Sequence, residues 1–197
     1  SPSEFGLLEL VLVLNGVYGA IILLGLDSAQ SIYFHKYKEA GFEAQKEIIT
    51  SVLQLRIVWG ALITLIFSIT LPLWVSLFSL GDLSKSFLIL ALLGTFLSQI
   101  SSQSIDIFRL IFRPIPCVTL SAFQSILNVS CILSLITYFE YGVGGFFLGS
   151  FIGASICVLT TWFITRKYIS PFKIHTKYWP MLVKFGIPLI PEALILH

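Results

Sequence analysis

Long apolar runs are the feature of this sequence that most restricts its fold. Each complete run has about 20 mostly apolar residues, enough to cross the hydrocarbon core of a bilayer as an α-helix. Because backbone polar groups find no water inside a bilayer, each run is expected to be helical. The runs cover residues 5–26, 57–80, 87–107, 118–138 and 143–165, and a further run begins near Val183 and continues to His197.

The composition supports a membrane protein and excludes a soluble domain. Hydrophobic residues make up 56% of the 197 residues, and charged residues only 11%. A soluble domain carries about 25% charged residues. The predicted fold class is therefore all-α, a polytopic membrane helix bundle with about six transmembrane helices.

The basic residues are distributed unevenly between the two sides of the predicted membrane. The connections at 27–56, 109–116 and 166–184 hold 11 of the 12 Lys and Arg residues, and Lys85 is the exception. Positive charge near the ends of spans favours the cytoplasmic side. The start of the chain is therefore expected outside, with one helix missing upstream and both ends of the sequence cut.

The first connection contains a second predicted helix. Residues 33–55 read as an interfacial helix that runs into the second span, with Ile48, Val52 and Leu55 on one face. Acidic residues recur every four positions at Glu39, Glu43 and Glu47, which predicts a solvated face.

Small residues predict a close helix contact in the last complete span. Gly145, Gly149 and Gly153 recur every four residues, and Cys157 continues the row. A row of this kind lets another backbone approach closely. We expect packing within the chain rather than dimerisation.

Polar side chains follow one face of each of two consecutive spans. Antiparallel neighbours with such faces either share a polar cavity or bond to each other within the bundle. The third span carries Thr95, Gln99, Ser102, Gln103 and Asp106, and the fourth carries Ser121, Gln124, Asn128 and Cys131.

Charged residues continue the polar face of the third span. Asp106, Arg109 and Arg113 share a helical face, which predicts either an Asp106–Arg109 ion pair at the membrane edge or a cationic lining for an anionic substrate. Arg56 is expected to extend to the interface from the start of the second span.

The last run contains a predicted helix break. Pro188 and Pro191 cannot donate backbone hydrogen bonds, so the helix is expected to kink there. Glu192 lies beside the break. A carboxylate within a membrane is a functional candidate, against the alternative that it only faces a cavity.

Catalytic and metal-binding patterns are not recognised in the sequence. The histidines, His35, His175 and His197, lie far apart, and the three cysteines are not paired at metal-ligand spacing. The basic residues flank spans rather than form a nucleic-acid surface. No enzyme activity, no metal and no nucleic-acid partner is predicted.

Three short motifs resemble a known family. The sequence GLDSA at residues 25–29, GVGG at 142–145 and KFGIPLIP at 184–191 resemble elements of the Wzx-type oligosaccharide flippases. These form the polysaccharide-biosynthesis branch of the MOP exporter superfamily, which also contains MATE exporters and lipid II flippases. The resemblance covers the whole chain.

The resemblance implies an architecture and an activity. Such proteins have 12 to 14 helices in two six-helix bundles, so residues 1–182 would supply helices two to six and residues 183–197 the truncated start of the seventh. They flip undecaprenyl-diphosphate-linked oligosaccharide, the repeat unit of O-antigen in lipopolysaccharide, of capsule or of exopolysaccharide, across the bacterial inner membrane by alternating access. No cofactor is implied beyond a coupling ion, H⁺ or Na⁺. The expected partners are this substrate, membrane lipids and other polysaccharide-assembly membrane proteins.

Individual residues take expected roles from this resemblance and from their positions. Gly25 and Asp27 form the structural motif that ends the first span, with Asp27 as a cap or anchor. The sugar path is expected at Gln99, Gln103, Gln124 and Asn128, the diphosphate contact at Arg109 and Arg113 beside Asp106, and ion coupling at Glu192.

Two positions depart from the family pattern. Ile32 stands near the place where the family often has an arginine, and Glu192 stands where a small residue is common. The alternatives are a MATE-like drug or cation antiporter and a polytopic glycan polymerase or ligase. The first would need a cavity richer in carboxylates and aromatics, and the second a long outside loop.

Overall fold

The structure, a computed structural model, describes residues 2–77, 85–170 and 175–189, and no strand occurs among them. The all-α prediction is confirmed. The helices are α1 (Pro2–Leu23), α2 (Leu26–Lys36), α3 (Phe42–Leu77), α4 (Lys85–Leu110), α5 (Pro114–Thr137), α6 (Gly142–Thr165) and α7 (Trp179–Gly186). Short 3₁₀ turns lie at η1 (Lys38–Ala40), η2 (Arg166–Tyr168), η3 (Thr176–Tyr178) and η4 (Ile187–Leu189).

Five stretches of the described chain are long and apolar enough to cross a membrane. They are Leu8–Lys36, Phe42–Leu77, Lys85–Leu110, Pro114–Thr137 and Gly142–Tyr168. Each contains most of one predicted apolar run, so the predicted set of complete spans is confirmed. The sixth run falls largely outside the described residues.

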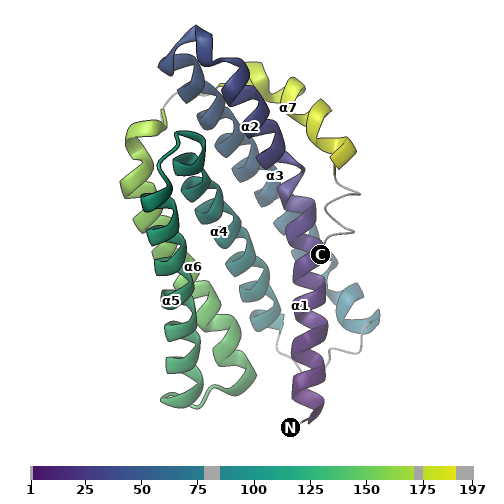
Figure 1. Cartoon of the computed structure of the whole chain (residues 1–197). Helices are drawn as coiled ribbons and strands as arrows, with labels where there is room; N and C mark the ends of the chain where they lie inside the picture. Colours follow the sequence, from purple (N-terminus) through teal and green to yellow (C-terminus); the bar gives the residue numbers. More distant parts are fainter. Residues whose placement is uncertain (1, 78–84, 171–174, 190–197) are drawn as a thin grey trace.

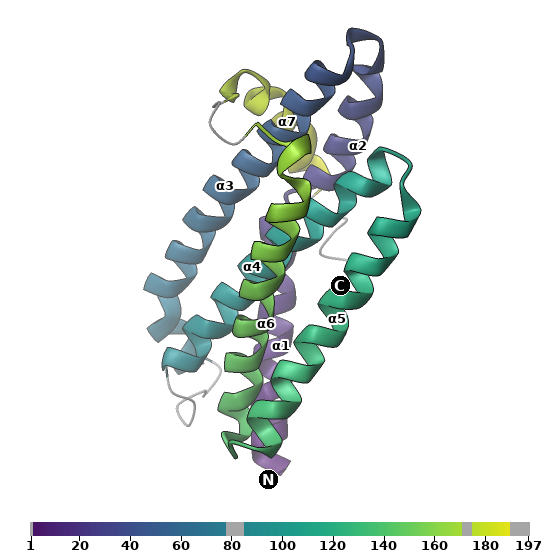
Figure 2. The same ribbon diagram turned by 90° about the vertical axis from the view of Figure 1, so that its left-hand side faces the viewer.

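Helix α4 lies at the centre of the bundle, in contact with α1, α3, α5 and α6 (Figure 1). A core of buried side chains joins α1, α3, α4 and α6, including Tyr18, Ile63, Leu92 and Phe147. Figure 2 shows α5 on the outside of α6 and α4. None of the side chains of α5 is buried, which is compatible with a helix whose outer surface faces lipid.

Helices α5 and α6 pack backbone against backbone along the glycine row. A Cβ added to Gly149 would lie 2.7 Å from Ile132 Cα, and one on Gly153 would lie 3.1 Å from Asn128 Cα. Gly145 approaches the carbonyl of Leu135 in the same way, with a Cβ distance of 3.2 Å. The glycine row therefore contacts a helix of the same chain.

The first span does not end at Leu26. Leu24 and Gly25 both have left-handed backbone angles, with φ of 47° and 59°, which interrupt the helix before it continues as α2. Gly186 of α7 packs directly on the Leu24 carbonyl, where a Cβ would find no space. The GLDSA motif thus forms a bend inside the first span, and α7 covers the bend.

The predicted interfacial helix over 33–55 is wrong in its start and in its position. Residues 33–36 belong to α2, and the chain turns through η1 and Gly41, whose φ is 92°. Helix α3 then runs as one 36-residue helix, about 54 Å long. The face formed by Ile48, Val52 and Leu55 is buried against α2 and α7. This part of α3 therefore packs within the bundle.

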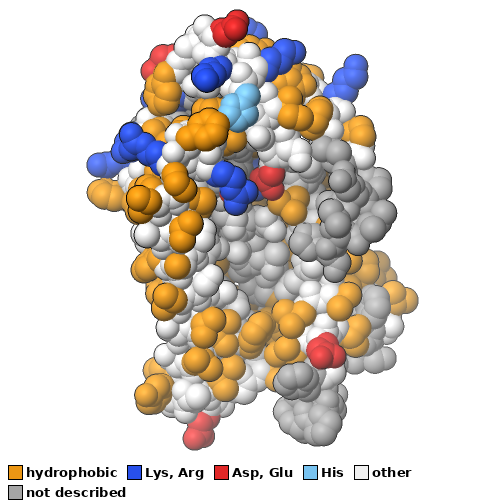
Figure 3. Space-filling view, in the orientation of Figure 1, with side chains coloured by type: hydrophobic (Ala, Val, Ile, Leu, Met, Phe, Trp, Pro, Cys, Tyr) orange, Lys and Arg blue, Asp and Glu red, His pale blue; other side chains and the backbone are white. Residues whose placement is uncertain are grey.

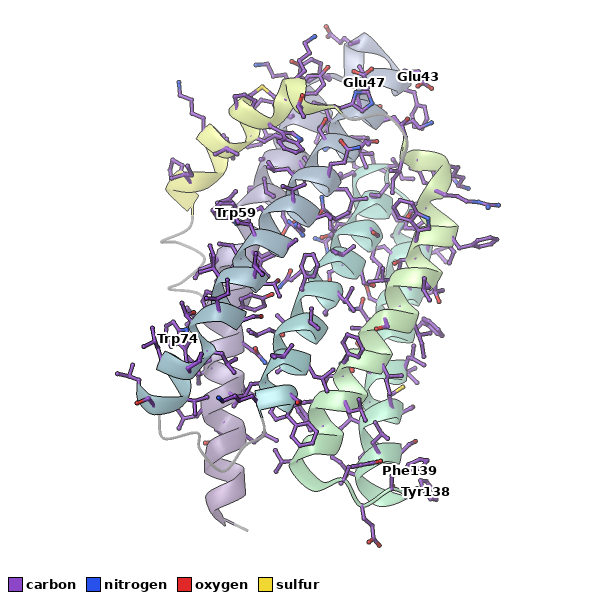
Figure 4. The ribbon with its side chains drawn as sticks, turned by 180° about the vertical axis from the view of Figure 1, so that it is seen from behind. Glu43, Glu47, Trp59, Trp74, Tyr138 and Phe139 are labelled. Atoms are coloured by element: carbon purple, nitrogen blue, oxygen red, sulfur yellow. The ribbon has the colours of Figure 1, made fainter. Side chains whose placement is uncertain are left out.

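Basic side chains gather at one end of the bundle, which we call the basic end. It is formed by α2, the start of α3, the α4–α5 turn, η2 and α7 (Figures 1 and 3). Figure 4 shows Glu43 and Glu47 at this end and Tyr138 and Phe139 at the opposite end. The gathering of basic side chains at one end agrees with the alternation of charged and short connections along the sequence. It also agrees with a bundle whose two ends face opposite sides of a membrane.

The chain between α6 and α7 is bonded to the start of α3 at several points. The backbone N–H of Ser170 donates to Thr50 Oγ1 at 3.0 Å, and the N–H of His175 donates to Gln54 Oε1 at 3.1 Å. Ser51 Oγ donates to the His175 carbonyl at 3.0 Å. The start of α3 therefore fixes the segment that leads into α7.

The acidic residues Glu39, Glu43 and Glu47 do not form one solvated helix face, contrary to the prediction. Glu39 lies in η1, and Glu43 is exposed on α3, but Glu47 is half-buried and accepts a hydrogen bond from the Tyr178 hydroxyl at 3.2 Å. Burial, together with the nearby Glu47 carboxylate, raises the pKa of Tyr178 above its ordinary value. The shift favours the protonated hydroxyl, which is the form that donates to Glu47.

Replacing Tyr178 with phenylalanine is expected to destabilise the protein by about 1 kcal/mol, because Glu47 loses its donor. Chemical unfolding of the full chain in detergent, followed by tryptophan fluorescence, measures this change. The control is Tyr138→Phe, whose side chain is 85% exposed at the other end of the bundle. Equal stability of the two variants would contradict the predicted role of the Tyr178–Glu47 contact.

Candidate functional site

The polar face of α4 borders two hollows that it shares with α5. Figure 3 shows this side of the molecule hollowed between α1 and α5, with an acidic and a basic side chain next to each other above the hollow. The first hollow lies nearer the basic end, and the second lies deeper in the bundle. Gln124 and Asn128 line both of them, so the hollows adjoin.

The hollow nearer the basic end is almost entirely polar. Its volume is about 370 Å³, and Ile105 is the one apolar side chain in its lining. From α4 it receives Ser102, Asp106 and Arg109, and from α5 it receives Ser121, Gln124, Ser125 and Asn128. Hydroxyl and amide groups of this kind can donate and accept hydrogen bonds, so the hollow can bind a hydroxyl-rich ligand.

The deeper hollow extends the polar lining toward α1 and α6. Its volume is about 260 Å³, and it is lined by Thr95, Ser98 and Gln99 of α4 as well as by apolar side chains. Gln124 Nε2 donates to Ser98 Oγ at 3.4 Å, and Ser101 Oγ donates to Gln124 Oε1 at 3.4 Å. Both bonds are long and therefore weak, so a ligand can compete for the Gln124 amide.

The side-chain oxygen of Asn128 lies at the contact between α5 and α6 and accepts no hydrogen bond from the described residues. This oxygen, Oδ1, is buried and lies 3.0 Å from the position of a Cβ on Gly153. A buried carbonyl without a donor is energetically unfavourable. A hydroxyl or amide of a bound ligand would satisfy it.

Asp106 and Arg109 form the ion pair that their spacing predicts, with Arg109 Nη2 3.1 Å from Asp106 Oδ1. The Arg109 side chain is 75% exposed, so the guanidinium keeps free donors for a second anion. A smaller hollow beside the pair is lined by Asp27, Gln30 and Ser31 of α2. The pair therefore lies between α2 and the polar hollow.

Gln103 does not line either hollow with the other predicted residues. It is buried, with 1% of its surface exposed, and its Nε2 donates to Gln30 Oε1 of α2 at 3.0 Å. Adjacent residues on an α-helix point about 100° apart, so Ser102 and Gln103 face different neighbours. In the described structure Gln103 connects α4 to α2.

The expected interfacial position of Arg56 is wrong. Its side chain is 1% exposed, and its Nη2 lies 2.6 Å from Asp27 Oδ1. Arg56 is more than three turns inside α3, because the helix begins at Phe42 and not near Arg56. Asp27 lies in the first turn of α2 without capping it by a side-chain bond, so it anchors the bend through this ion pair.

The remaining predicted residues lie apart from the hollows. Arg113 follows α4 and lines a different pocket, described below. Pro188 lies in η4, directly after α7 ends at Gly186, so the helix changes at the predicted place. Pro191 and Glu192 lie outside the described residues. Within the described part of the chain, no group of three or more His, Cys, Asp or Glu residues is placed to hold a metal ion.

These features define a class of protein. The chain is an all-helical, multi-pass membrane protein with a polar cavity within an otherwise apolar bundle. A sequence model of the family described as polysaccharide biosynthesis protein matches residues 1–196, and the chain belongs to that family. No curated protein and no solved structure matches it. The resemblance inferred from the three motifs is confirmed at the level of this family.

Proposed function

We propose that the protein is a transporter that flips undecaprenyl-diphosphate-linked oligosaccharide across the bacterial inner membrane by alternating access. The family supports a role in polysaccharide synthesis or transport. The observation that carries the finer proposal is the composition of the two hollows, which combine hydroxyl and amide side chains with Arg109 at the basic end.

The chemistry of this lining suits a sugar with an attached diphosphate. Ser102, Gln124 and Asn128 offer the donors and acceptors that sugar hydroxyls need. Arg109 offers a guanidinium, which binds phosphate through charge-assisted and often bidentate hydrogen bonds. In this proposal the diphosphate contacts Arg109 at the basic end, and the sugars extend along Gln124, Asn128 and Gln99.

The lining disfavours the alternative of a drug or cation antiporter. Asp106 is the one carboxylate among the residues lining the two hollows shared by α4 and α5, and Arg109 already neutralises it. A cation site without a free carboxylate is poor, because burying a positive charge requires a partner. Ion coupling through Glu192, with H⁺ or Na⁺, remains part of the proposal and lies outside the described residues.

The glycan polymerase or ligase alternative is also disfavoured. Such an enzyme needs catalytic groups on the outer side, and α5 and α6 are joined there by only residues 138–141. The proposed partners are the lipid-linked substrate, membrane lipids and other polysaccharide-assembly membrane proteins.

Replacing Arg109 with glutamine is expected to lower export of surface glycan about ten-fold, because one charge-assisted contact to phosphate is lost. Gln124→Leu, which removes the amide shared by both hollows, is expected to lower export by a similar factor. The measurement is surface glycan in a bacterium that lacks its own flippase and carries the full chain, normalised to the amount of protein in the membrane.

The matched control for the export experiment is Arg166→Gln. Arg166 is exposed at the same end of the bundle, and its guanidinium lies over the Phe163 ring, 4.3 Å from the centroid. The control should export normally. Normal export by both Arg109→Gln and Gln124→Leu, at normal protein levels, would reject the proposed path.

A further inference from the structure

A separate pocket lies at the basic end, outside the hollows described above. We call it the terminal pocket, and its volume is about 330 Å³. Its polar lining comes from different elements: His35 of α2, Lys38 of η1, Gln45 of α3 and Arg113 of the α4–α5 turn. The pocket's ten lining residues include no Asp or Glu. A pocket of this composition attracts anions.

The positive charges of the terminal pocket are not neutralised within the described structure. Arg56 is paired with Asp27, and Arg109 with Asp106. In the part of the chain that the structure describes, neither Lys38 nor Arg113 has an ion-pair partner. Two cations that line one pocket without a counter-charge repel each other, and a bound anion would relieve that repulsion.

Other basic side chains at this end differ from these two in their surroundings. Lys36 Nζ lies over the Tyr33 ring, 5.9 Å from the centroid, and the Arg166 guanidinium lies over Phe163. Neither residue lines the terminal pocket. Lys38 and Arg113 are therefore distinguished by lining the same pocket, although other basic residues are spread over the whole end (Figure 3).

The backbone of the α4–α5 turn is shaped to place Arg113 at the pocket. Phe112 has φ of 54°, in the left-handed region that non-glycine residues rarely adopt. This conformation reverses the chain after α4, and the Arg113 N–H donates to the Phe108 carbonyl at 2.8 Å. Because a non-glycine residue is strained in this conformation, contacts elsewhere in the fold must maintain the turn.

The pocket walls are aromatic and apolar, in contrast to the hollow of the proposed path nearer the basic end. The Phe42 and Tyr168 rings meet edge to face at 6.5 Å, and the His35 and Phe112 rings lie 5.9 Å apart. Leu110, at the end of the α4 span, completes the wall beside Phe34. A pocket with cationic donors and apolar walls at the end of a span matches a ligand with an anionic head and a hydrocarbon chain.

We propose that the terminal pocket binds the phosphate group of a membrane lipid. Basic pockets between membrane helices at the cytoplasmic side bind anionic lipid headgroups. Arg113 and Lys38 supply charge to the phosphate oxygens, and His35 supplies a ring N–H donor. The phosphate has two sources, the phospholipids of the bilayer and a polyprenyl diphosphate. The first source does not depend on the proposed transport function.

The test compares lipid binding by the full chain, purified in detergent, using native mass spectrometry. Phosphatidylglycerol and undecaprenyl diphosphate are titrated separately, with phosphatidylcholine as the neutral reference. The double variant Lys38→Gln with Arg113→Gln is expected to weaken binding of at least one anionic lipid about 25-fold, since each cation near a membrane surface contributes about five-fold.

The control variant is Lys36→Gln with Arg166→Gln, which removes the same total charge from the same end without touching the pocket. It should bind both anionic lipids within two-fold of the unmodified protein. Selective loss of phosphatidylglycerol assigns the pocket to bilayer phospholipid, and selective loss of undecaprenyl diphosphate assigns it to the substrate. Unchanged binding by the pocket variant, or an equal loss in the control, overturns the proposal.

Discussion

Replacement of Gly149 with leucine is expected to prevent α5 and α6 from packing and to leave little folded protein. A Cβ at this position would lie 2.7 Å from Ile132 Cα and 2.8 Å from Ile132 N. These are backbone atoms, which can move only if the two helices separate. Overpacking of a core costs about 1–3 kcal/mol where side chains can adjust, and here the loss should be at least about 3 kcal/mol.

The measurement is the thermal midpoint of the full chain in detergent, followed by size-exclusion chromatography with fluorescence detection. Gly16→Leu is the matched control, because nothing lies within 4 Å of a Cβ added to Gly16 of α1. Gly153→Ala should fall between the two, since Asn128 Oδ1, at 3.0 Å, can move but Asn128 Cα, at 3.1 Å, cannot. A Gly149 variant as stable as the Gly16 variant would contradict the close backbone contact.

The glycine row shows which part of the fold is accessible from sequence. A spacing of four residues determines that Gly145, Gly149 and Gly153 share a face, because the helix repeats every 3.6 residues. The same reasoning yields the five complete spans from the length of their apolar runs. Which helix covers the glycine face is a property of the assembled bundle, and the periodicity carries no information about it.

The first connection shows where this reasoning fails. Hydropathy places a boundary wherever charged residues begin, so it predicts that Asp27 and Arg56 lie outside the spans. In the structure both lie inside helical segments and neutralise each other. Residues separated by 29 positions give no local signal of such a pair. The left-handed bend at Leu24 and Gly25 was likewise hidden by an uninterrupted apolar run.

The polar face of α4 was predicted in part. Gln99 and Asp106 border hollows, as Gln124 and Asn128 of α5 do, so the two polar faces do meet. The sequence offered a shared cavity and interhelical bonding as alternatives, and the described structure contains both. Gln103 forms a hydrogen bond with Gln30 and does not line either hollow. Arg113 lines the terminal pocket, because the turn at Phe112 ends the helical periodicity on which its predicted position depends.

The ion pair between Asp27 and Arg56 leads to an asymmetric prediction. Asp27→Asn is expected to destabilise the protein by about 3–5 kcal/mol, because it leaves a buried cation without its counter-charge. Arg56 is 1% exposed, whereas Asp27 is 45% exposed. Arg56→Met should cost only about 1–2 kcal/mol, since water can solvate the remaining carboxylate.

The asymmetry extends to the double variant. Combining Asp27→Asn with Arg56→Met removes both charges, and a buried ion pair replaced by neutral groups of similar size is often tolerated. The double variant should therefore be more stable than Asp27→Asn alone, so the second substitution rescues the first. Unfolding midpoints of all three variants of the full chain, in one detergent and at one pH, measure the coupling.

The second Asp–Arg pair of the bundle supplies the control for this cycle. Asp106→Asn removes the partner of Arg109, whose side chain is 75% exposed, so the loss should be about 0.5 kcal/mol. Burial of the arginine is then the property that separates the two pairs. If Asp27→Asn were no more harmful than Asp106→Asn, or if Arg56→Met failed to rescue it, the pair at the bend would not be the contact that holds α2 against α3.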